Sequence, residues 1–422
     1  MNRPINMPNS PPVTPSVAKP RIALVHDWLV SPGGAEKVLL ELHEMYPDAP
    51  IYTANYVPEK FPEFKNADVR PTWLDRISLA KKKHQLFSVF RAWVFRGLDL
   101  SDFDIVISSC SAESKYVQTG EQTLHICYCH TPVRYYWSDY EWYLAHPPFG
   151  KLNWLVKGLL PMMIGWLRRI DYRGAQTVDR FVANSRFVQA RIAKYYHKDS
   201  TVIHAPVSVA QFPVSRERDD YYLIVGRQVA YKRLDLAVDA FNELGLPLKV
   251  AGTGEEIAKQ KPRAKGNIEF LGRVPDEQLP GLYGRAKGFI FPTEEDFGIV
   301  PIEAMACGTP VIAFGVGGAL ETVVEGQTGT FFHEKTPAAL VDAVRRFQEM
   351  AFDPDLVRAQ AERFSQAVFR QAMGQFVAEE WNRFGLEANE LPGSTDCTAT
   401  ENPAAEATTA HDAAMSFEGS VK

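Results

Sequence analysis

The chain has 422 residues, of which 45% are hydrophobic and 23% are charged, and its formal net charge at pH 7 is −5. This length is too great for one ordinary core and suits two domains of average size. The composition is that of a globular protein that folds in water. Because the net charge is negative, we expect no nucleic-acid partner, and any attraction to phosphate or to anionic lipid must be local.

The N-terminus and the cysteines indicate where the protein resides. Residues 1–20 carry prolines where a signal peptide would carry an apolar run, so we expect a disordered leader. The five cysteines form no C-x-x-C pair and their number is odd, which favours reduced thiols. No uncharged apolar stretch of roughly 18 residues occurs, so we expect no transmembrane helix. The sequence thus predicts a cytoplasmic protein, either free or at the inner face of the membrane.

The first half of the chain alternates between strand-like and helix-like segments. From residue 21, RIALVHDWLV has the apolar character of a buried parallel strand, and AEKVLLELHEMY has apolar positions at helical spacing. Strand-length apolar runs recur at 104–108, 123–127 and 180–183, with helix-compatible segments between them. This alternation is typical of a doubly wound α/β domain, which we assign to residues 21–205.

A second series follows a change of composition near residues 204–213, which suggests a linker. Short apolar runs at 222–225, 248–251, 268–270, 288–291 and 311–313, and a shorter one at 331–332, predict a second α/β domain over 206–365. We predict two Rossmann-like, doubly wound parallel-sheet domains that face a cleft. A C-terminal helix over 366–386 is expected to pack back on the first domain, and residues 387–422 to form a disordered tail.

The most informative stretch is FPTEEDFGIVPIEAMACGTPVIA, residues 291–313. An acidic, glycine-containing turn follows the strand, and a helix opens near Pro301 and ends at Gly308. A helix that starts at the carboxyl end of a parallel strand directs free N–H groups toward a ligand, which suits a diphosphate. Glu295 and Glu303 could then reach a sugar hydroxyl and a ribose. The alternative is a solvated acidic turn followed by an ordinary helix-start glutamate.

This stretch resembles the E-x7-E motif of the family-four retaining glycosyltransferases, which have the GT-B fold. The resemblance rests on Glu-Asp-Phe-Gly at its start and Glu-Ala-Met-Ala-Cys-Gly-Thr-Pro-Val-Ile-Ala at its end. It implies that Glu295 contacts the donor sugar as a catalytic residue, helped by the backbone around Phe297 and Gly298. It also implies that Glu303 holds the nucleotide ribose.

Two further clusters lie directly after predicted strands. Arg227 and Lys232 follow YYLIVG, and two cations at a strand's carboxyl end suit a leaving diphosphate, although an exposed basic turn would look the same. Gly33 and Gly34 follow the first strand and would let backbone approach a ligand, unless they form a generic tight turn. The family resemblance assigns both clusters to the donor diphosphate. No G-x-G-x-x-G follows the first strand, which disfavours a dehydrogenase.

His130 lies in CYCHTPVRYYW, directly after a predicted strand. A lone histidine is more often structural than catalytic, but the resemblance implies that this one faces the donor sugar as a catalytic residue. Its His-Thr-Pro-x-Arg-Tyr context is similar to mannosyltransferases of bacterial O-antigen and exopolysaccharide assembly. Asn184-Ser185 and Gly317-Gly318 with Glu321 also resemble segments of the family, and we assign them no catalytic role.

Residues 71–98 and 151–169 mix tryptophan, phenylalanine and leucine with lysine and arginine. Basic segments with aromatic residues suit an anionic membrane surface. The alternative is a set of helices packed on the first domain with their charges toward water. A glycan acceptor linked to polyprenyl diphosphate would explain both segments.

These observations predict a retaining glycosyltransferase that moves mannose from GDP-mannose to a hydroxyl of a growing, lipid-linked polysaccharide or lipopolysaccharide precursor. We expect neither a metal nor another cofactor, because the one acidic SDFD run, at 101–104, precedes a strand and is typical of a turn. Three alternatives stay open at this point: a transferase that uses a UDP-sugar, a GT-B sugar-nucleotide epimerase, and a non-catalytic scaffold that binds sugar nucleotides.

Overall fold

The computed structural model describes residues 19–82, 87–145 and 153–390. Its first domain is built on a seven-stranded sheet, and every neighbouring pair of strands in that sheet is parallel. The strand order β3-β2-β1-β4-β5-β6-β7 is that of a doubly wound sheet. The strands are β1 (Ile22–His26), β2 (Ile51–Thr53), β3 (Val69–Pro71), β4 (Ile105–Cys110), β5 (Leu124–Cys129), β6 (Arg180–Ala183) and β7 (Ser200–Val202).

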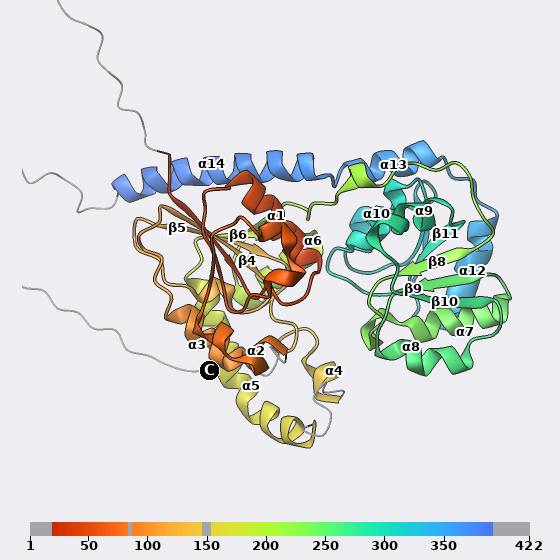
Figure 1. The fold of residues 1–422 in the computed structure, drawn as a ribbon, viewed down its shortest axis with the longest axis horizontal. Helices are drawn as coiled ribbons and strands as arrows, with labels where there is room; N and C mark the ends of the chain where they lie inside the picture. Colours follow the sequence, from red (N-terminus) through yellow and green to blue (C-terminus); the bar gives the residue numbers. More distant parts are fainter. Residues whose placement is uncertain (1–18, 83–86, 146–152, 391–422) are drawn as a thin grey trace, which may run out of the picture.

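Helices cover both faces of this sheet (Figure 1). The central strands β4 and β5 are buried over their whole length, as expected for parallel strands covered on both sides. α5 projects beyond the rest of the domain and begins close to α4 (Figure 1). The helices are α1 (Gly34–Met45), α2 (Ser78–Lys82), α3 (Ser88–Arg96), α4 (Tyr140–Ala145), α5 (Asn153–Gln176) and α6 (Arg186–Tyr196).

The second domain has a six-stranded sheet in the order β10-β9-β8-β11-β12-β13, again parallel throughout. The predicted fold class, two doubly wound parallel sheets, is therefore confirmed. Its strands are β8 (Tyr222–Val225), β9 (Leu248–Ala251), β10 (Ile268–Gly272), β11 (Gly288–Phe291), β12 (Val311–Phe314) and β13 (Gly329–Phe332). Its helices are α7 (Leu234–Leu244), α8 (Glu255–Gln260), α9 (Leu279–Gly284), α10 (Ile299–Ala306), α11 (Ala319–Thr322), α12 (Pro337–Gln348) and α13 (Pro354–Glu362).

The last helix, α14 (Gln366–Glu390), follows the second domain in sequence but lies along the first (Figure 1). Arg370 Nε is 2.6 Å from Glu41 Oε2 on α1, and Arg180 at β6 contacts Glu380 and Glu387 at 2.5 and 3.0 Å. The helix continues to Glu390, so residues 387–390 of the predicted tail belong to it. The rest of that tail, and residues 1–18 of the predicted leader, lie outside the described residues.

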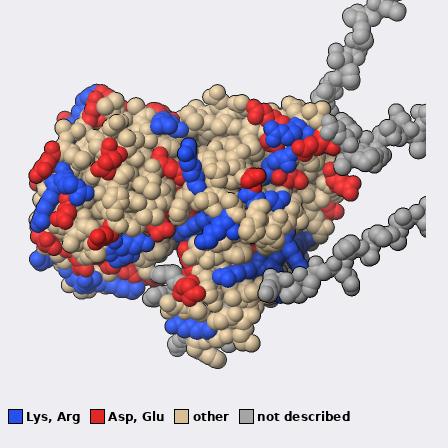
Figure 2. All heavy atoms as spheres, turned by 180° about the vertical axis from the view of Figure 1, so that it is seen from behind, with Lys and Arg blue, Asp and Glu red and all other residues tan. Residues whose placement is uncertain are grey.

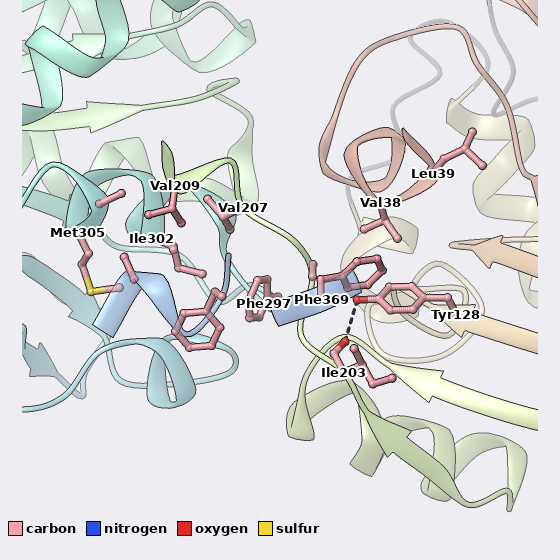
Figure 3. Close-up of a cluster of buried hydrophobic side chains, with 14 of the residues drawn as sticks. Val38, Leu39, Tyr128, Ile203, Val207, Val209, Phe297, Ile302, Met305 and Phe369 are labelled. Atoms are coloured by element: carbon pink, nitrogen blue, oxygen red, sulfur yellow. Dashed lines mark hydrogen bonds between the residues drawn. The ribbon is translucent and has the colours of Figure 1, made fainter. Parts of the chain in front are cut away.

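One hydrophobic cluster runs from the first domain through the linker into the second (Figure 3). It joins Tyr128 of β5, Phe369 of α14 and Phe297 beside α10, with Val207 of the linker between the sheets. The Tyr128 hydroxyl donates to the carbonyl of Ile203 at 2.9 Å, which fixes the start of the linker on the first sheet. The domains are thus held together by apolar packing on one side of their interface. Within the described residues, no helix combines the length and the apolar content needed to cross a bilayer.

Candidate functional site at the domain interface

Glu295 and Lys232 meet at the carboxyl end of the second sheet. Glu295 lies on the loop between β11 and α10, and Lys232 on the loop after β8. Lys232 Nζ is 2.8 Å from Glu295 Oε1, and each side chain is less than one-fifth exposed. Burial alone would lower the pKa of Lys232, but the Glu295 carboxylate outweighs burial and raises it. Lys232 therefore stays charged at this position and is paired with the Glu295 carboxylate.

Arg227 follows the same strand as Lys232 and is exposed. It lies near enough for its charge to act on Lys232. The spacing of five residues thus brings both cations to one strand end, where Glu295 neutralises only one of them. An exposed guanidinium beside a paired ammonium is suited to an anion that carries more than one negative charge.

The start of α10 is shaped by a glycine and by a buried ring. Gly298 has a φ of +88°, a conformation in which a side chain would be strained, and it turns the chain into the helix. The Phe297 ring is buried and stacks on His204 of the linker, with ring centres 5.5 Å apart. Phe297 therefore directs its side chain into the core between the domains. What Phe297 and Gly298 can offer a ligand is backbone.

Gly317 and Gly318 let their loop approach the loop that carries Glu295. The N–H of Gly318 donates to the carbonyl of Glu295 at 2.9 Å. A Cβ on Gly318 would lie 2.3 Å from Phe297 Cα, so any other residue would force the two loops apart. Gly317 has a φ of +71°, which likewise favours glycine. Gly317-Gly318 thus supports the loop that carries Glu295 and has no need to touch a ligand.

Glu303 lies within α10 and is buried, and its two oxygens are both occupied. Tyr283 donates to Oε2 at 3.0 Å, and Lys37 Nζ lies 2.7 Å from Oε1. Lys37 belongs to α1, so this ion pair crosses between the domains. A ribose at Glu303 would have to share the carboxylate with Lys37 or displace it. The pattern of the second domain alone could not reveal Lys37, because the partners are 266 positions apart.

Gly33 and Gly34 lie directly opposite the start of α10. Gly33 precedes α1 and Gly34 is its first residue. A Cβ on Gly34 would lie 2.9 Å from Ile299 Cδ1, at the first residue of α10. The first turns of α1 and α10 therefore meet at the domain interface, and they bring two sets of free helical N–H groups to one place.

His130 is held from behind by a short polar chain. Its Nε2 lies 2.8 Å from Ser109 Oγ, which is 3.1 Å from Nδ1 of His26. Burial, with the nearby His26, lowers the pKa of His130 to about 3 despite the opposing charge of Asp27. The imidazole is neutral at physiological pH. It can exchange hydrogen bonds with a ligand, but it cannot supply positive charge or act as a strong acid.

Asp27 fixes the loop next to this histidine, and sequence reasoning did not find it. Its carboxylate accepts four backbone N–H groups of residues 111–114, at 2.6–2.9 Å. Such a carboxylate holds the chain leaving β4 in one conformation. The available signal was its position, since Asp27 follows β1 directly, at the same sheet edge as His130.

Asp296 is the neighbour of Glu295 but faces the first domain. Arg134 donates to Asp296 Oδ2 from Nε at 3.1 Å and from Nη2 at 2.6 Å, and Arg191 Nη1 lies 2.5 Å from Oδ1. The Ser185 hydroxyl donates to the Asp296 carbonyl at 2.6 Å. Burial would lower the pKa of Arg134, but the Asp296 and Asp139 carboxylates together raise it, so the guanidinium stays charged. These contacts close the domain interface beside the loop that carries Glu295.

Glu321 makes a second polar contact between the domains. It accepts from the backbone N–H groups of Arg186 and Phe187, at 3.0 and 3.2 Å, at the start of α6. Its other partner is His204 Nε2 at 3.0 Å, in the linker. Burial would raise the pKa of Glu321, but these hydrogen bonds lower it, so the carboxylate is ionised. The Asn184-Ser185 and Gly317-Gly318 segments therefore meet at the interface, with a structural role.

Two family models match the chain. Residues 32–211 match the model described as Glycosyltransferase Family 4, and residues 210–367 match that of Glycosyl transferases group 1. Among solved structures, Anabaena HepE in complex with UDP aligns with a TM-score of 0.61 at 18% identity, over 85% of this chain and 100% of that chain. The boundary between the two family models lies within the linker that joins the two sheets.

Relatives of the chain include two mannosyltransferases. The alpha-1,3/1,6-mannosyltransferase of Mus musculus is 25% identical over 82% of this chain and 93% of its own length. A GDP-mannose-dependent phosphatidylinositol monomannoside mannosyltransferase of Mycolicibacterium smegmatis is 29% identical over 44% of this chain and 56% of its own. An uncharacterized glycosyltransferase of Methanocaldococcus jannaschii is 27% identical over 39% and 48%. The chain thus matches only about half the length of the last two relatives.

Proposed function

We propose that this chain, a glycosyltransferase of the GT-B type, transfers mannose from GDP-mannose to a hydroxyl of a lipid-linked glycan, with retention of the anomeric configuration. The observation that carries the proposal is the pair of Lys232 and Glu295 beside the start of α10. The Lys232 ammonium and the Glu295 carboxylate lie 2.8 Å apart and match the two ends of a sugar diphosphate, because phosphate binds the cation and sugar hydroxyls donate to the carboxylate.

The leaving group is stabilised by three positive elements. When the donor binds, its diphosphate pairs with the ammonium of Lys232. Arg227 helps to stabilise the negative charge that develops on the diphosphate as the bond to the sugar breaks. The N–H groups at the start of α10 add their partial positive charge. Glu295, released from Lys232, accepts hydrogen bonds from the sugar. Glu303 accepts from the ribose in place of Lys37.

The transfer needs no carboxylate nucleophile. The acceptor oxygen forms a bond to the anomeric carbon on the face from which the diphosphate departs, and a donor phosphate oxygen takes the acceptor proton. His130, neutral and held through Nε2 by Ser109, turns its other ring nitrogen to the sugar as a hydrogen-bonding group. It positions the donor and leaves proton transfer to the phosphate. No step calls for a metal ion, and we expect turnover to survive EDTA.

Mannose is favoured by two relatives whose names state mannosyl transfer, one of them from GDP-mannose. A thermal-shift screen of GDP-mannose against UDP-sugars tests this part first. A ligand at a hundred times its dissociation constant stabilises by about 2.7 kcal/mol, which is a clear shift. Stabilisation by UDP-sugars alone would overturn GDP-mannose as the donor.

Turnover separates the remaining alternatives. Release of GDP with formation of an α-linked mannoside supports retaining transfer, and a β-linked product contradicts it. Conversion of the donor without an acceptor identifies an epimerase. Binding without hydrolysis or transfer, with any nucleotide-sugar and a lipid-linked acceptor present, identifies a scaffold.

A further inference from the structure

The first domain carries an apolar cavity that the proposed chemistry does not use. Its volume is about 340 Å³, and it lies between α3, α5 and the turn at Trp73. Trp73, Phe90, Trp93 and Trp166 form much of its wall, and Arg96 adds a cation. The Trp73 and Trp93 rings meet edge to face with centres 6.0 Å apart. We call the described residues of 73–96 and 153–170, which surround this cavity, the aromatic lobe.

The aromatic lobe exposes side chains that globular proteins normally bury. Trp93 is 68% exposed, Phe90 52% and Trp166 49%, and Trp154 and Met162 on α5 are still more exposed. Among the side chains that the structure describes, every exposed tryptophan or phenylalanine lies in this lobe. A concentration of exposed apolar groups on one projection marks an interaction surface.

Charge indicates what this surface meets. The aromatic lobe carries several lysines and arginines and one acidic residue, Asp75, which pairs with Lys81, although the whole chain has a net charge of −5. Arg76, Lys157 and Arg169 are exposed. Seen from behind, the first domain carries basic side chains along and above its projecting part (Figure 2). The partner is therefore both apolar and anionic.

The aromatic lobe is also firmly joined to the site. Asp171 lies at the base of the projecting part of α5 and is fully buried. It pairs with Lys115 Nζ at 2.7 Å and accepts a hydrogen bond from the indole N–H of Trp137 at 2.6 Å. Trp137 belongs to the same loop as His130, and Tyr136 of that loop forms the inner wall of the cavity. A partner that binds the aromatic lobe would therefore lie next to the first-domain side of the site.

We propose that the aromatic lobe docks on an anionic lipid bilayer and that its cavity receives one lipid acyl chain. Indole rings favour the headgroup level of a bilayer, and lysine and arginine beside them attract anionic headgroups. A membrane fits a surface that is apolar and basic together, whereas an acidic protein would leave the tryptophans facing water. This inference extends the proposed function, since a lipid-linked acceptor places the reaction at a membrane.

Vesicle flotation without any nucleotide-sugar tests the inference independently of catalysis. Wild-type protein is expected to float with phosphatidylcholine vesicles that contain phosphatidylglycerol, and far less with phosphatidylcholine alone. Phe90→Ser with Trp93→Ser should weaken binding about tenfold or more, because two large apolar side chains leave the bilayer. Leu356→Ser, at a 57% exposed site on α13, is the matched control and should bind as wild type. Equal thermal midpoints establish that the variants fold.

Charge reversal and quenching test the two parts of the surface separately. Lys157→Glu with Arg169→Glu should weaken binding by at least about 25-fold, given roughly fivefold for each basic residue near an anionic surface. Phosphatidylglycerol with brominated acyl chains should quench wild-type tryptophan fluorescence. Ala92→Leu, which fills the cavity, should reduce that quenching while flotation persists. Failure of wild-type protein to float with anionic vesicles, or flotation that both double variants leave unchanged, would overturn the docking surface. Unaltered quenching in Ala92→Leu would overturn the acyl-chain site.

Discussion

Glu295 and Asp296 are neighbours on one loop, but their side chains serve different regions of the molecule. Glu295 turns to the second domain and pairs with Lys232 at the end of β8. Asp296 turns to the first domain and is held by Arg134 and Arg191. The contact with Lys232 and the contact that joins the domains are thus made by adjacent residues. Because the same backbone carries both residues, we expect a movement of one domain relative to the other to shift Glu295 as well.

The largest effect is expected from Glu295→Gln. The amide keeps the shape of the side chain but loses the negative charge that holds Lys232 and the sugar. We expect kcat to fall about 10²- to 10³-fold, as when a preorganised polar group is removed from a transition state. Initial rates of transfer measure this, with Glu294→Gln one position earlier as the control. Full activity of Glu295→Gln would remove Glu295 from the proposed site.

Asp296→Asn tests the domain-closing half of the comparison. It leaves two arginines without their shared carboxylate, and we expect a loss of about 2 kcal/mol in the free energy of unfolding. Small-angle X-ray scattering should show a larger radius of gyration than for wild type or Glu295→Gln. If Asp296→Asn kept the wild-type radius and stability but lost turnover, the two neighbours would share one role and the distinction would fail.

The first domain shows a similar division between two histidines, one on β5 and one directly after it. His130 faces the interface, whereas His125 lies at the other end of the strand, where burial lowers its pKa to about 4. Both pKa values lie below the unfolded value of about 6.5, so the unfolded chain binds more protons and stability is lost as pH falls from 6.5 toward 4. Each histidine contributes up to about 1.4 kcal/mol per pH unit.

Urea unfolding between pH 7 and pH 5 measures this loss. His125→Gln should flatten the pH dependence and keep transfer activity, whereas His130→Asn should flatten it and impair transfer. A free energy of unfolding that stays constant from pH 7 to pH 5 would contradict the burial of both neutral rings.

Lys37→Met carries the smallest expected effect. Lys37 is about half exposed, so its pair with Glu303 should contribute less than about 1 kcal/mol to stability. In the proposed site Lys37 occupies a carboxylate oxygen that the ribose would use, so we expect GDP to bind up to about fivefold more tightly to the variant. Isothermal titration calorimetry decides the direction, with Lys335→Met, which pairs with Glu294, as the control. Weaker binding would show that Lys37 helps to hold the nucleotide.

The placement of the proposed donor residues could be predicted from sequence because they are contiguous. Glu295, Gly298 and Glu303 follow one strand within a few residues, and a parallel strand followed by a helix fixes where they lie. The same holds for Arg227 and Lys232 after β8. Local spacing and the direction of the strand were enough to place these residues, whereas their proposed roles rest on the resemblance to the family.

The contacts between the domains could not be predicted in this way. Arg134 and Asp296 are 162 positions apart, and no periodic pattern connects residues of two separate sheets. Strands β2, β3 and β7 were also missed, because three residues are too few to show an alternation. The aromatic segments were found, but only the structure shows that their rings surround a cavity.

The chain crosses between the domains twice, and both crossings lie at one place. The N–H of Val207, on the way out, donates to the carbonyl of Phe364, on the way back, at 2.9 Å. The second domain is thus attached like an insert whose two ends touch. An exchange of residues 208–363 for those of another GT-B protein would therefore place both chain junctions at one point of the fold, and it would have to keep the partners of Lys37, Arg134 and Arg191 in the second domain.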